Sequence, residues 1–439
     1  MTKVLVLGAG LVGGPLVRYL LNVDGFTVTV ASRTVVKAQA LVGGADNGIA
    51  LFLNVKDEAA LEALIADHDL SISLLPYVYH PTVARLCVKH TKQMVTTSYV
   101  KPEMQALDAG AKEAGVILLN EIGVDPGVDH MSAMETIHQI ADKGGKLISF
   151  TSNTGGLPAP DANDNPFGYK FSWAPRGVVL AGKNPAKFLK DGEVVDVPGL
   201  ELFSYHWPCE IKGFGELEVY PNRDSMPYIK AYGIPTVTSM FRGTLRYPGW
   251  CEILKKIVDL GLLDETERDD IAGLTYERLL ARLIDSDGAD LKFDLAEFLA
   301  IAADSEPIAG LEWLGLLSDD IIPAVDSTYL DVVASRMLSK MEYSPGERDM
   351  LVMQHEFVVK YPDRTEKITS TMVDYGIPNG DSSMSRLVGL PAAIAARMIL
   401  QREINLTGVR VPMIPEIYKP VLAELAGMGI SFQETVETL

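Results

Sequence analysis

Cysteine is scarce in this chain of 439 residues: there are only three, Cys87, Cys209 and Cys251. They lie far apart and form no Cys-x-x-Cys pair, so neither a disulfide framework nor a zinc ribbon is expected. Such sparse cysteine usage is typical of a reducing compartment, and we therefore expect a cytoplasmic protein.

Positive charge is also in short supply. The chain has 39 Lys and Arg against 58 Asp and Glu, which gives a formal net charge of −19. Because DNA, RNA and anionic membranes repel such a chain, we expect no nucleic-acid and no membrane partner. Long hydrophobic runs are missing too: the first apolar run breaks at Gly8, so neither a signal peptide nor a membrane span is predicted.

Several catalytic motifs are absent from the sequence. There is no Gly-x-Ser-x-Gly, no His-Glu-x-x-His and no Walker-type loop, which gives hydrolase and kinase functions little support. His130 follows Asp129, but no second ligand has a suitable spacing. We therefore expect a structural histidine and no metal site.

What the chain does have is a regular alternation of short apolar segments with helical patterns over its first part. Because strands that alternate with helices form parallel sheets, this predicts an α/β fold with an N-terminal, doubly wound Rossmann sheet. The predicted strands are residues 3–8, 26–31, 49–55, 70–76, 93–99 and 116–123.

After Gly123 the sequence pattern changes: residues 144–173 begin as a predicted strand and become a predicted loop rich in Gly, Pro, Asn and Asp. Residues 250–320 read as mainly helical, and residues 350–375 alternate with period two on both sides of Pro362-Asp363, which predicts an antiparallel hairpin. A long apolar helix is predicted over 384–401. These patterns indicate a second α/β (α+β) domain, interrupted by a helical insertion.

A glycine loop follows the first predicted strand. Gly8, Gly10 and Gly13 have the Gly-x-Gly-x-x-Gly spacing and enclose Leu11 and Val12. The first glycine permits a tight turn, the second a close approach to a pyrophosphate, and the third close packing of helix and strand. The loop predicts dinucleotide binding; the alternative is a tight turn with no ligand.

The second predicted strand ends in Ala31, Ser32 and Arg33, where many dinucleotide-binding folds have an acidic residue. An acid there accepts hydrogen bonds from a free ribose 2′-hydroxyl, whereas an arginine and a serine pair with a 2′-phosphate. We therefore predict NADP(H) rather than NAD(H), the alternative being that Arg33 is a solvated residue at a helix start.

Other strand ends point to the same crevice, because ligands of such sheets bind beyond the carboxyl ends of the strands. The candidates for cofactor contact there are Asn54, Val55, Leu75, Pro76, Val124, Asp125 and Pro126. Tyr99, with Ser98 before it, supplies a phenol, and Asp125 supplies a carboxylate, so this pair could move protons beside a hydride transfer. The alternative for Asp125 is an ordinary turn aspartate.

Three arginines, Arg223, Arg242 and Arg246, lie in Gly- and Pro-rich stretches farther along the chain. Such arginines are natural clamps for carboxylates, although surface salt bridges explain them equally well. Taken as clamps, they suggest a substrate with several carboxylates.

A family pattern runs through the chain in order: "TSY", "NEIGVDPGVDH", "GGLPAPDANDNPFGYKFSW", "YPNRDS", "RGTLRYPGW", "ERDMLVMQHEF" and "SSMSRLVGLPAAIA". With these motifs the sequence resembles the NADP-dependent, L-glutamate-forming saccharopine dehydrogenases, also called saccharopine reductases. The resemblance implies the reductive condensation of L-2-aminoadipate 6-semialdehyde with L-glutamate to saccharopine. This reversible reaction belongs to the α-aminoadipate route of lysine biosynthesis.

The resemblance also implies residue roles and an architecture. The substrate residues would be Ser98, Tyr99, Asp125, Arg223, Thr244, Leu245 and Arg246, and Ser172 would join the cofactor residues. The expected domains are 1–124 plus 388–439 for NADP(H), 125–240 plus 325–387 for substrate, and a helical part at 241–324. Thr154 stands where relatives can have a cysteine, so that thiol cannot be required.

Two alternatives stay open at this point. A related imine reductase, such as carboxynorspermidine synthase, would accept a diamine in place of glutamate. A non-catalytic NADP(H)-binding regulator would retain the fold without the reaction. The expected partners are small-molecule substrates, and the sequence leaves open whether the chain forms a homodimer.

Overall fold

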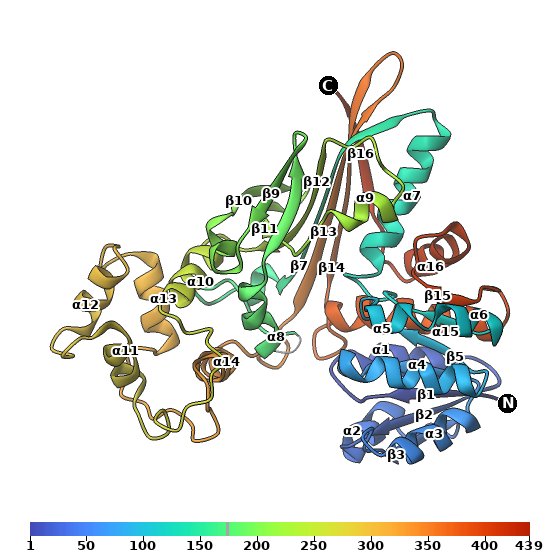
Figure 1. The fold of residues 1–439 in the computed structure, drawn as a ribbon, viewed down its shortest axis with the longest axis horizontal. Coiled ribbons are helices and arrows are strands. Elements are labelled where there is room, and N and C mark those ends of the chain that lie inside the picture. Colours follow the sequence, from blue (N-terminus) through green and yellow to red (C-terminus); the bar gives the residue numbers. More distant parts are fainter. Residues whose placement is uncertain (173–174) are drawn as a thin grey trace. The chain divides into compact units, whose positions relative to one another are not determined.

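In the computed structural model, residues 1–172 and 175–439 are described, and their contacts divide the chain into two compact units (Figure 1). The first unit comprises Met1–Gly144 and Gly380–Gln433. The second comprises Gly145–Asn379 and Glu434–Leu439. Each unit therefore combines segments that lie far apart in the sequence.

The first unit contains a seven-stranded sheet with the order β15-β6-β5-β4-β1-β2-β3, and its neighbouring strands run parallel. Six of these strands follow the Rossmann order 3-2-1-4-5-6, which confirms the predicted doubly wound sheet. The strands are β1 (Thr2–Leu7), β2 (Phe26–Ser32), β3 (Gly48–Phe52), β4 (Leu70–Ser73), β5 (Gln93–Thr96), β6 (Ile117–Leu119) and β15 (Gly408–Arg410).

Helices cover both faces of this sheet (Figure 1). On one face, Leu61, Val83 and Ala111 share a hydrophobic cluster with Leu5 and Leu7 of β1. The helices of the unit are α1 (Gly13–Leu21), α2 (Val35–Val42), α3 (Glu58–Asp67), α4 (His80–Lys89), α5 (Pro102–Gln105), α6 (Asp108–Glu113), α7 (Val128–Asp142), α15 (Ser383–Leu400) and α16 (Pro415–Gly427), with the short 3-10 turn η1 (Tyr77–Tyr79).

The long apolar helix predicted near the end of the chain is α15. By length and composition it could cross a membrane, but 72% of the relevant window is buried inside the protein, as in a core helix. Ser382 caps its first turn by accepting a 3.0 Å hydrogen bond from the Ser385 N–H. At Gly389 a Cβ would lie 2.9 Å from the Val12 carbonyl oxygen, so α15 packs directly against the chain that leads into α1.

The second unit is built on a mixed sheet with the order β10-β11-β12-β7-β13-β14-β16, and β8 and β9 lie off this path. β12 runs parallel to β7, whereas β13 is antiparallel to both β7 and β14. The strands are β7 (Lys146–Pro158), β8 (Ala186–Lys190), β9 (Glu193–Val197), β10 (Trp207–Ile211), β11 (Gly215–Pro221), β12 (Ser239–Arg246), β13 (Asp349–Lys360), β14 (Thr365–Tyr375) and β16 (Gln433–Thr438).

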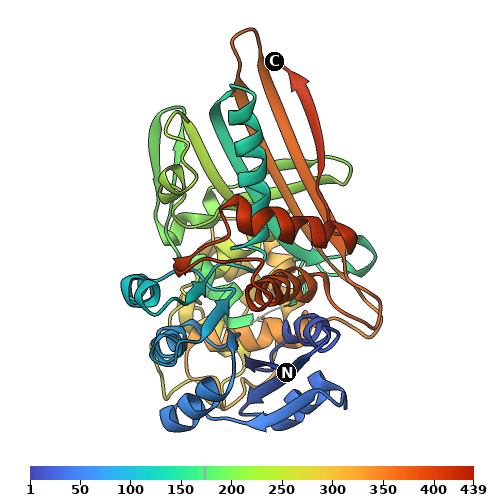
Figure 2. The same cartoon turned by 90° about the vertical axis from the view of Figure 1, so that its right-hand side faces the viewer.

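The predicted hairpin is confirmed as β13 and β14, whose pairing closes at Lys360 and Thr365 (Figure 2). β7 is longer than expected, because the strand continues through Gly155 and Gly156, where the sequence suggested a loop. At Gly155 a Cβ would lie 2.7 Å from the Leu245 carbonyl oxygen. Glycine is therefore needed here because β7 and β12 approach each other closely, and it does not mark the end of a strand.

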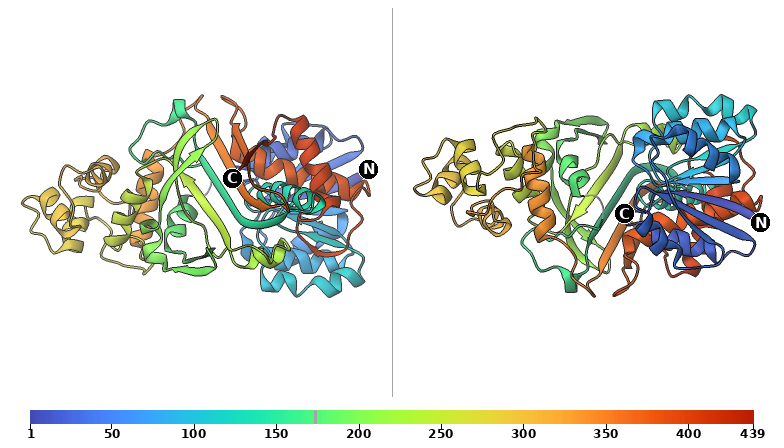
Figure 3. Two further views of the ribbon diagram at one scale, coloured as in Figure 1. Left: turned by 90° about the horizontal axis from the view of Figure 1, so that it is seen from above. Right: turned by 90° about the horizontal axis from the view of Figure 1, so that it is seen from below.

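The helices of the second unit share one hydrophobic cluster with its sheet. Trp250, Leu279 and Leu330 pack in the same cluster as Leu157 and Leu245 of the strands, while the helices α11 to α13 lie beyond one end of the sheet (Figure 3). The expected separation of a third, helical domain therefore stays a prediction. The helices are α8 (Pro175–Leu180), α9 (Pro227–Ala231), α10 (Trp250–Asp259), α11 (Tyr276–Ile284), α12 (Leu291–Phe298), α13 (Glu306–Leu314) and α14 (Tyr329–Lys340), with the 3-10 turns η2 (Pro160–Ala162), η3 (Ala181–Lys183) and η4 (Gly199–Ser204).

The contact between α15 and the segment before α1 gives a stability prediction. Gly389→Ala should lower the free energy of unfolding by about 1–3 kcal/mol, because the new methyl group would press on the backbone of Val12. Helix propensity alone would raise it by up to about 1 kcal/mol. The control is Gly110→Ala in α6, where the new Cβ would meet only Val88 at 3.8 Å and stability should rise slightly. Urea unfolding measures both, and a gain in stability for Gly389→Ala contradicts the packing argument.

Candidate functional site

The glycine loop lies between β1 and α1, at the edge where the parallel strands end. Gly8 has φ +109°, and a Cβ there would lie 3.1 Å from the Leu74 carbonyl oxygen. At Gly10 a Cβ would meet nothing within 4 Å, so open space lies beside the backbone. A Cβ at Gly13 would lie 3.0 Å from Leu41 Cδ1 of α2, so this glycine permits helix–helix packing rather than the expected packing of helix and strand.

The start of α1 is open to a negatively charged ligand. Val12 stands at its N-cap position and provides no side-chain hydrogen bond, and Leu11 before it is exposed. The N–H groups of the first turn of a helix have no partners within the helix, and the helix dipole is positive there. A pyrophosphate fits such a site.

The end of β2 carries the two residues expected to choose the cofactor. The Ser32 hydroxyl oxygen accepts a 3.1 Å hydrogen bond from the Thr34 N–H. Arg33 is exposed, and its guanidinium forms neither a hydrogen bond nor an ion pair with any residue that the structure describes. Its charge is therefore available to a ligand phosphate.

The other strand-end candidates follow β3 and β4 at the same edge. Asn54 forms a turn in which its side-chain oxygen accepts from the Lys56 N–H at 3.2 Å, and Val55 is half-buried. Leu75 is half-buried, and Pro76 is exposed immediately before η1. Together with the open space at Gly10 and the charge of Arg33, this edge fits a dinucleotide that carries a 2′-phosphate.

Tyr99 and Asp125 come together as expected. The Tyr99 hydroxyl donates a 3.0 Å hydrogen bond to Asp125 Oδ1, and both side chains are partly exposed. The turn between Val124 and Pro126 is fixed by backbone bonds, among them Gly123 N–H to the Pro126 carbonyl at 3.0 Å. A phenol and a carboxylate in contact form a short path for a proton.

A buried histidine supports this turn. His130 is fully buried, with Nε2 3.1 Å from Glu121 Oε2 and Nδ1 3.5 Å from Asp129 Oδ2. The second oxygen of Asp129 accepts the Gly127 N–H at 2.6 Å, and Glu121 also accepts the Val100 N–H at 2.8 Å. These contacts fit the expected structural role. Among the described residues, no group of three or more His, Cys, Asp or Glu could hold a metal ion.

His80 is a residue that the sequence did not point to. It is the first residue of α4, is buried, and lies 2.8 Å through Nε2 from the Ser98 hydroxyl oxygen. Only its place at the start of the helix after the fourth strand could have suggested a role.

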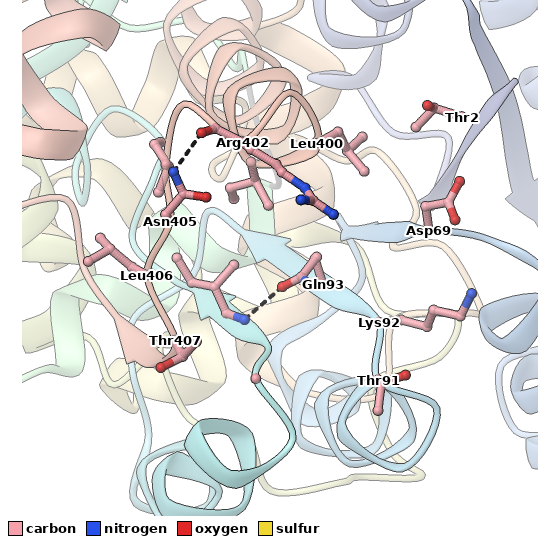
Figure 4. A pocket seen from close by; sticks show the side chains of 14 residues that line it. Thr2, Asp69, Thr91, Lys92, Gln93, Leu400, Arg402, Asn405, Leu406 and Thr407 are labelled. Atoms are coloured by element: carbon pink, nitrogen blue, oxygen red, sulfur yellow. Dashed lines mark hydrogen bonds between the residues drawn. The ribbon is translucent and has the colours of Figure 1, made fainter.

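A cavity of about 580 Å³ lies at the opposite edge of the same sheet (Figure 4). It is lined by Thr2, Asp69, Lys92, Gln93 and Ile117 at the starts of strands, and by Arg402 after α15. The negative ends of helix dipoles meet at this edge, and cations such as Lys92 and Arg402 balance them. The cavity therefore does not resemble the expected phosphate site.

In the second unit, Arg246 is the last residue of β12 and is only 5% exposed. Its guanidinium carbon lies 4.8 Å from the ring centre of Tyr169 and 5.2 Å from that of Trp250. One nitrogen donates to the Leu245 carbonyl at 2.7 Å. Among the described residues, Nε has no hydrogen-bond partner and no carboxylate pairs with the side chain. A buried charge held only by aromatic rings and a carbonyl is ready to receive a carboxylate.

The remaining candidates of this unit have different surroundings. Thr244 pairs with Thr154 across β12 and β7, and the buried Thr154 hydroxyl has no partner among the described residues. The Leu245 side chain packs in the hydrophobic cluster, because successive strand residues face opposite ways. Arg223 is exposed, with φ +56°, in the loop after β11. Ser172 is buried, and its hydroxyl has no partner among the described residues; the Trp that follows it lies outside them.

None of the three cysteines is placed as a nucleophile. All three are free, and burial raises the pKa of Cys87 to about 12 and that of Cys209 to about 11. Burial also raises the pKa of Cys251 far above its usual range. The thiolate form that reactions need is therefore suppressed.

A Rossmann sheet with an open glycine loop and a free arginine after its second strand defines a dinucleotide-binding protein of the dehydrogenase class. Two family models match the chain: "Saccharopine dehydrogenase NADP binding domain" over residues 4–119 and "Saccharopine dehydrogenase C-terminal domain" over residues 123–430. The chain belongs to the saccharopine dehydrogenase family.

Similar proteins match nearly the whole chain. It is 41% identical over 447 residues to saccharopine dehydrogenase [NADP(+), L-glutamate-forming] of Schizosaccharomyces pombe, covering 99% of each chain. It is 40% identical to the mitochondrial alpha-aminoadipic semialdehyde synthase of Bos taurus, where the match covers 99% of this chain but 48% of the bovine protein. The apo saccharopine dehydrogenase (L-Glu forming) of Saccharomyces cerevisiae has the same fold, with a TM-score of 0.92, 39% identity and 100% of both chains covered.

The free charge of Arg33 predicts the cofactor preference. Arg33→Asp should raise the Kd for NADPH by about 10- to 100-fold, because one charge-assisted contact to the 2′-phosphate is lost and a repulsion is gained. The Kd for NADH should change little. Nucleotide titration followed by fluorescence measures both.

The matched control for this change is Arg402→Asp. Arg402 is an exposed arginine of the same unit whose side chain also lacks a described partner, but it lies at the opposite edge of the sheet. Its replacement should leave both nucleotide affinities unchanged. An equal loss of NADPH and NADH affinity in Arg33→Asp would show that Arg33 does not read the phosphate.

Proposed function

We propose that this protein is an NADP(H)-dependent saccharopine dehydrogenase. It catalyses the reversible reductive condensation of L-2-aminoadipate 6-semialdehyde with L-glutamate to saccharopine, in the α-aminoadipate pathway of lysine biosynthesis. The observation that carries the proposal is the buried guanidinium of Arg246, which has no described carboxylate partner. Saccharopine carries three carboxylates, and such a cation is suited to one of them.

The first unit holds the cofactor in this proposal. The glycine loop and the uncapped start of α1 face the pyrophosphate, and Ser32 and Arg33 bind the 2′-phosphate. Asn54, Val55, Leu75, Pro76 and the turn from Val124 to Pro126 complete the part of the site that lies in this unit. Ser172, a residue of the second unit, stays a predicted cofactor contact. When bound, NADPH supplies the hydride that reduces the imine.

Imine formation needs proton movements that Tyr99 and Asp125 can perform. The amine of glutamate attacks the carbonyl carbon of the semialdehyde, and the new C–N bond leaves a surplus proton on nitrogen. On the way to the neutral imine the nitrogen gives up both of its protons, and the former carbonyl oxygen takes up two and departs as water. The 3.0 Å contact from the Tyr99 hydroxyl to Asp125 lets one group take a proton from nitrogen while the other gives one to oxygen, and proton transfer within the pair restores it for the second proton.

Arginine side chains hold the substrate in place. Arg246 takes one carboxylate, with Thr244 on the same face of β12, and the exposed Arg223 takes another. In the first unit, Ser98 is the predicted substrate residue that offers a hydroxyl. Fixing the carboxylates places the reacting carbon and contributes the orientation that a reaction between bound partners needs.

The protein acts on small molecules, and we propose that it does so in the cytoplasm. Association into a homodimer stays a prediction, which light scattering of the purified chain would test.

The assay that tests the function follows NADPH consumption with the semialdehyde and one amine. Glutamate should support turnover, and a diamine such as the substrate of carboxynorspermidine synthase should not. Saccharopine should in turn reduce NADP⁺ faster than NAD⁺. Turnover with the diamine alone would assign the protein to the related imine reductases. Nucleotide binding without any turnover would make it a regulator.

The unpaired charge of Arg246 predicts opposite effects on stability and on binding. Arg246→Met should raise the free energy of unfolding by about 1 kcal/mol or more, because a buried charge without a counter-ion is replaced by an apolar chain in an aromatic cage. The same change should raise the KM for saccharopine by about 10- to 100-fold.

The matched control is Arg336→Met in α14. Arg336 also lies over an aromatic ring, at 4.7 Å from the centre of Tyr276, but it donates to Asp320 at 2.6 Å. Its replacement should lower stability and leave KM unchanged. Urea unfolding and steady-state kinetics give both numbers, and a destabilised Arg246→Met with normal KM would make Arg246 a structural residue.

Asp125 predicts an effect mainly on turnover. Asp125→Ala should lower kcat by about 10²–10⁴-fold, with a far smaller change in the Kd for NADPH, because a proton carrier is lost. Combining it with Tyr99→Phe should cost little more than the larger single change, since the two groups work as a unit. Near-normal turnover of Asp125→Ala would remove this carboxylate from the mechanism.

A further inference from the structure

A buried histidine, His80, lies directly beneath Ser98, a residue that the proposed function places against the substrate. The ring is 4% exposed, and its Nδ1 lies 2.9 Å from the Ser73 hydroxyl oxygen. Its Nε2 lies 2.8 Å from the Ser98 hydroxyl oxygen. Burial lowers the pKa of His80 to about 4, so at ordinary assay pH the ring is neutral and carries one N–H.

The neighbouring Thr96 decides which nitrogen carries that proton. The Thr96 hydroxyl must donate to the Ser73 carbonyl oxygen at 2.9 Å, because a carbonyl can only accept. Its oxygen also receives the Ser98 N–H at 3.4 Å. Thr96 therefore turns only lone pairs toward His80 Nε2, which is 3.4 Å away. If Nε2 carried no proton, its lone pair would face the lone pairs of the Thr96 oxygen, which is unfavourable. If Nε2 carries the proton, its N–H faces two acceptor oxygens, those of Thr96 and Ser98.

The rest of the chain of hydrogen bonds then follows. With the proton on Nε2, Nδ1 accepts from the Ser73 hydroxyl, whose only described partner is His80. Nε2–H donates to the Ser98 oxygen. The Ser98 proton is left over, and among the described residues its hydroxyl has no second partner to receive it.

We infer that His80 is a positioning residue that makes the half-buried Ser98 hydroxyl a hydrogen-bond donor aimed at the ligand. Such a hydroxyl selects an acceptor, and the acceptor that the proposed reaction offers is a carboxylate oxygen of saccharopine or of its amino-acid precursors. A substrate amine, which would need Ser98 to accept, is disfavoured at this point. The inference rests on the proposed function for the identity of the ligand but not for the state of the histidine.

The first experiment measures the histidine itself. In the unmodified protein labelled with ¹⁵N-histidine, NMR should show one of the seven histidines as a neutral ring protonated at Nε2, and this signal should vanish in His80→Gln. A ring protonated at Nδ1 would overturn the inference. This result does not depend on which substrate the protein uses, so it separates failure of the inference from failure of the proposed function.

The second experiment measures the consequence for binding. His80→Leu removes the donor and should raise the KM for saccharopine by about 10- to 100-fold, with the KM for NADP⁺ unchanged. His80→Gln keeps an N–H near Ser98 and should recover most of the loss. In a Ser98→Ala background, His80→Leu should add no further increase, because the hydroxyl that it orients is gone.

Two outcomes of these measurements would contradict the inference about His80. If His80→Leu raises the KM as much without Ser98 as with it, the histidine acts through the fold and the inference fails. NADP⁺ binding by each variant checks that it has folded. If His80→Leu does not bind NADP⁺, two results still test the inference: the NMR measurement and the comparison of His80→Gln with Ser98→Ala. A KM for saccharopine that is raised as much in His80→Gln as in Ser98→Ala counts against the inference.

Discussion

The structure depends on keeping a few cationic and donor groups without partners among the described residues, one of them buried and the others at the surface. Arg246 is buried among aromatic rings with no described counter-ion, Arg33 is free after β2, and the start of α1 has no capping side chain. The buried Arg246 would be more stable with a partner in the protein, whereas water solvates the exposed Arg33. Their common property is that they suit anions: a pyrophosphate, a 2′-phosphate and a carboxylate. The ligands therefore complete an electrostatic arrangement that the fold leaves open.

The surrounding elements keep these groups in place. α15, from the far end of the sequence, packs on the segment that leads into α1 so closely that Gly389 has no room for a side chain. The His130 cluster fixes the turn that carries Asp125, and the chain from Ser73 through His80 fixes the Ser98 hydroxyl. In both cases a buried histidine supports a neighbour that the proposed function places at the ligand. In that proposal, part of the geometry of the site is set by residues that do not touch the substrate.

Much of the fold was predictable from sequence, because alternating strands and helices, glycine spacing and period-two segments are local signals. The Rossmann sheet, the β13–β14 hairpin and α15 were all predicted correctly. The continuation of β7 through Gly155 was missed, since glycine normally ends a strand and only the distant Leu245 explains it. The roles of the site residues stay predictions. The contact between Tyr99 and Asp125 was expected from their strand ends, whereas other contacts could not be predicted. That Leu245 faces the core and that His80 lies under Ser98 follow from strand register and tertiary packing.

The most direct test of this account is a crystal structure of the protein with NADP⁺ and saccharopine. A carboxylate of saccharopine should lie within hydrogen-bond distance, about 2.7–3.2 Å, of the Arg246 guanidinium. The 2′-phosphate of the cofactor should contact Arg33 at the same kind of distance. A complex in which Arg246 keeps only its present partners, while the carboxylates are bound elsewhere, would contradict the account.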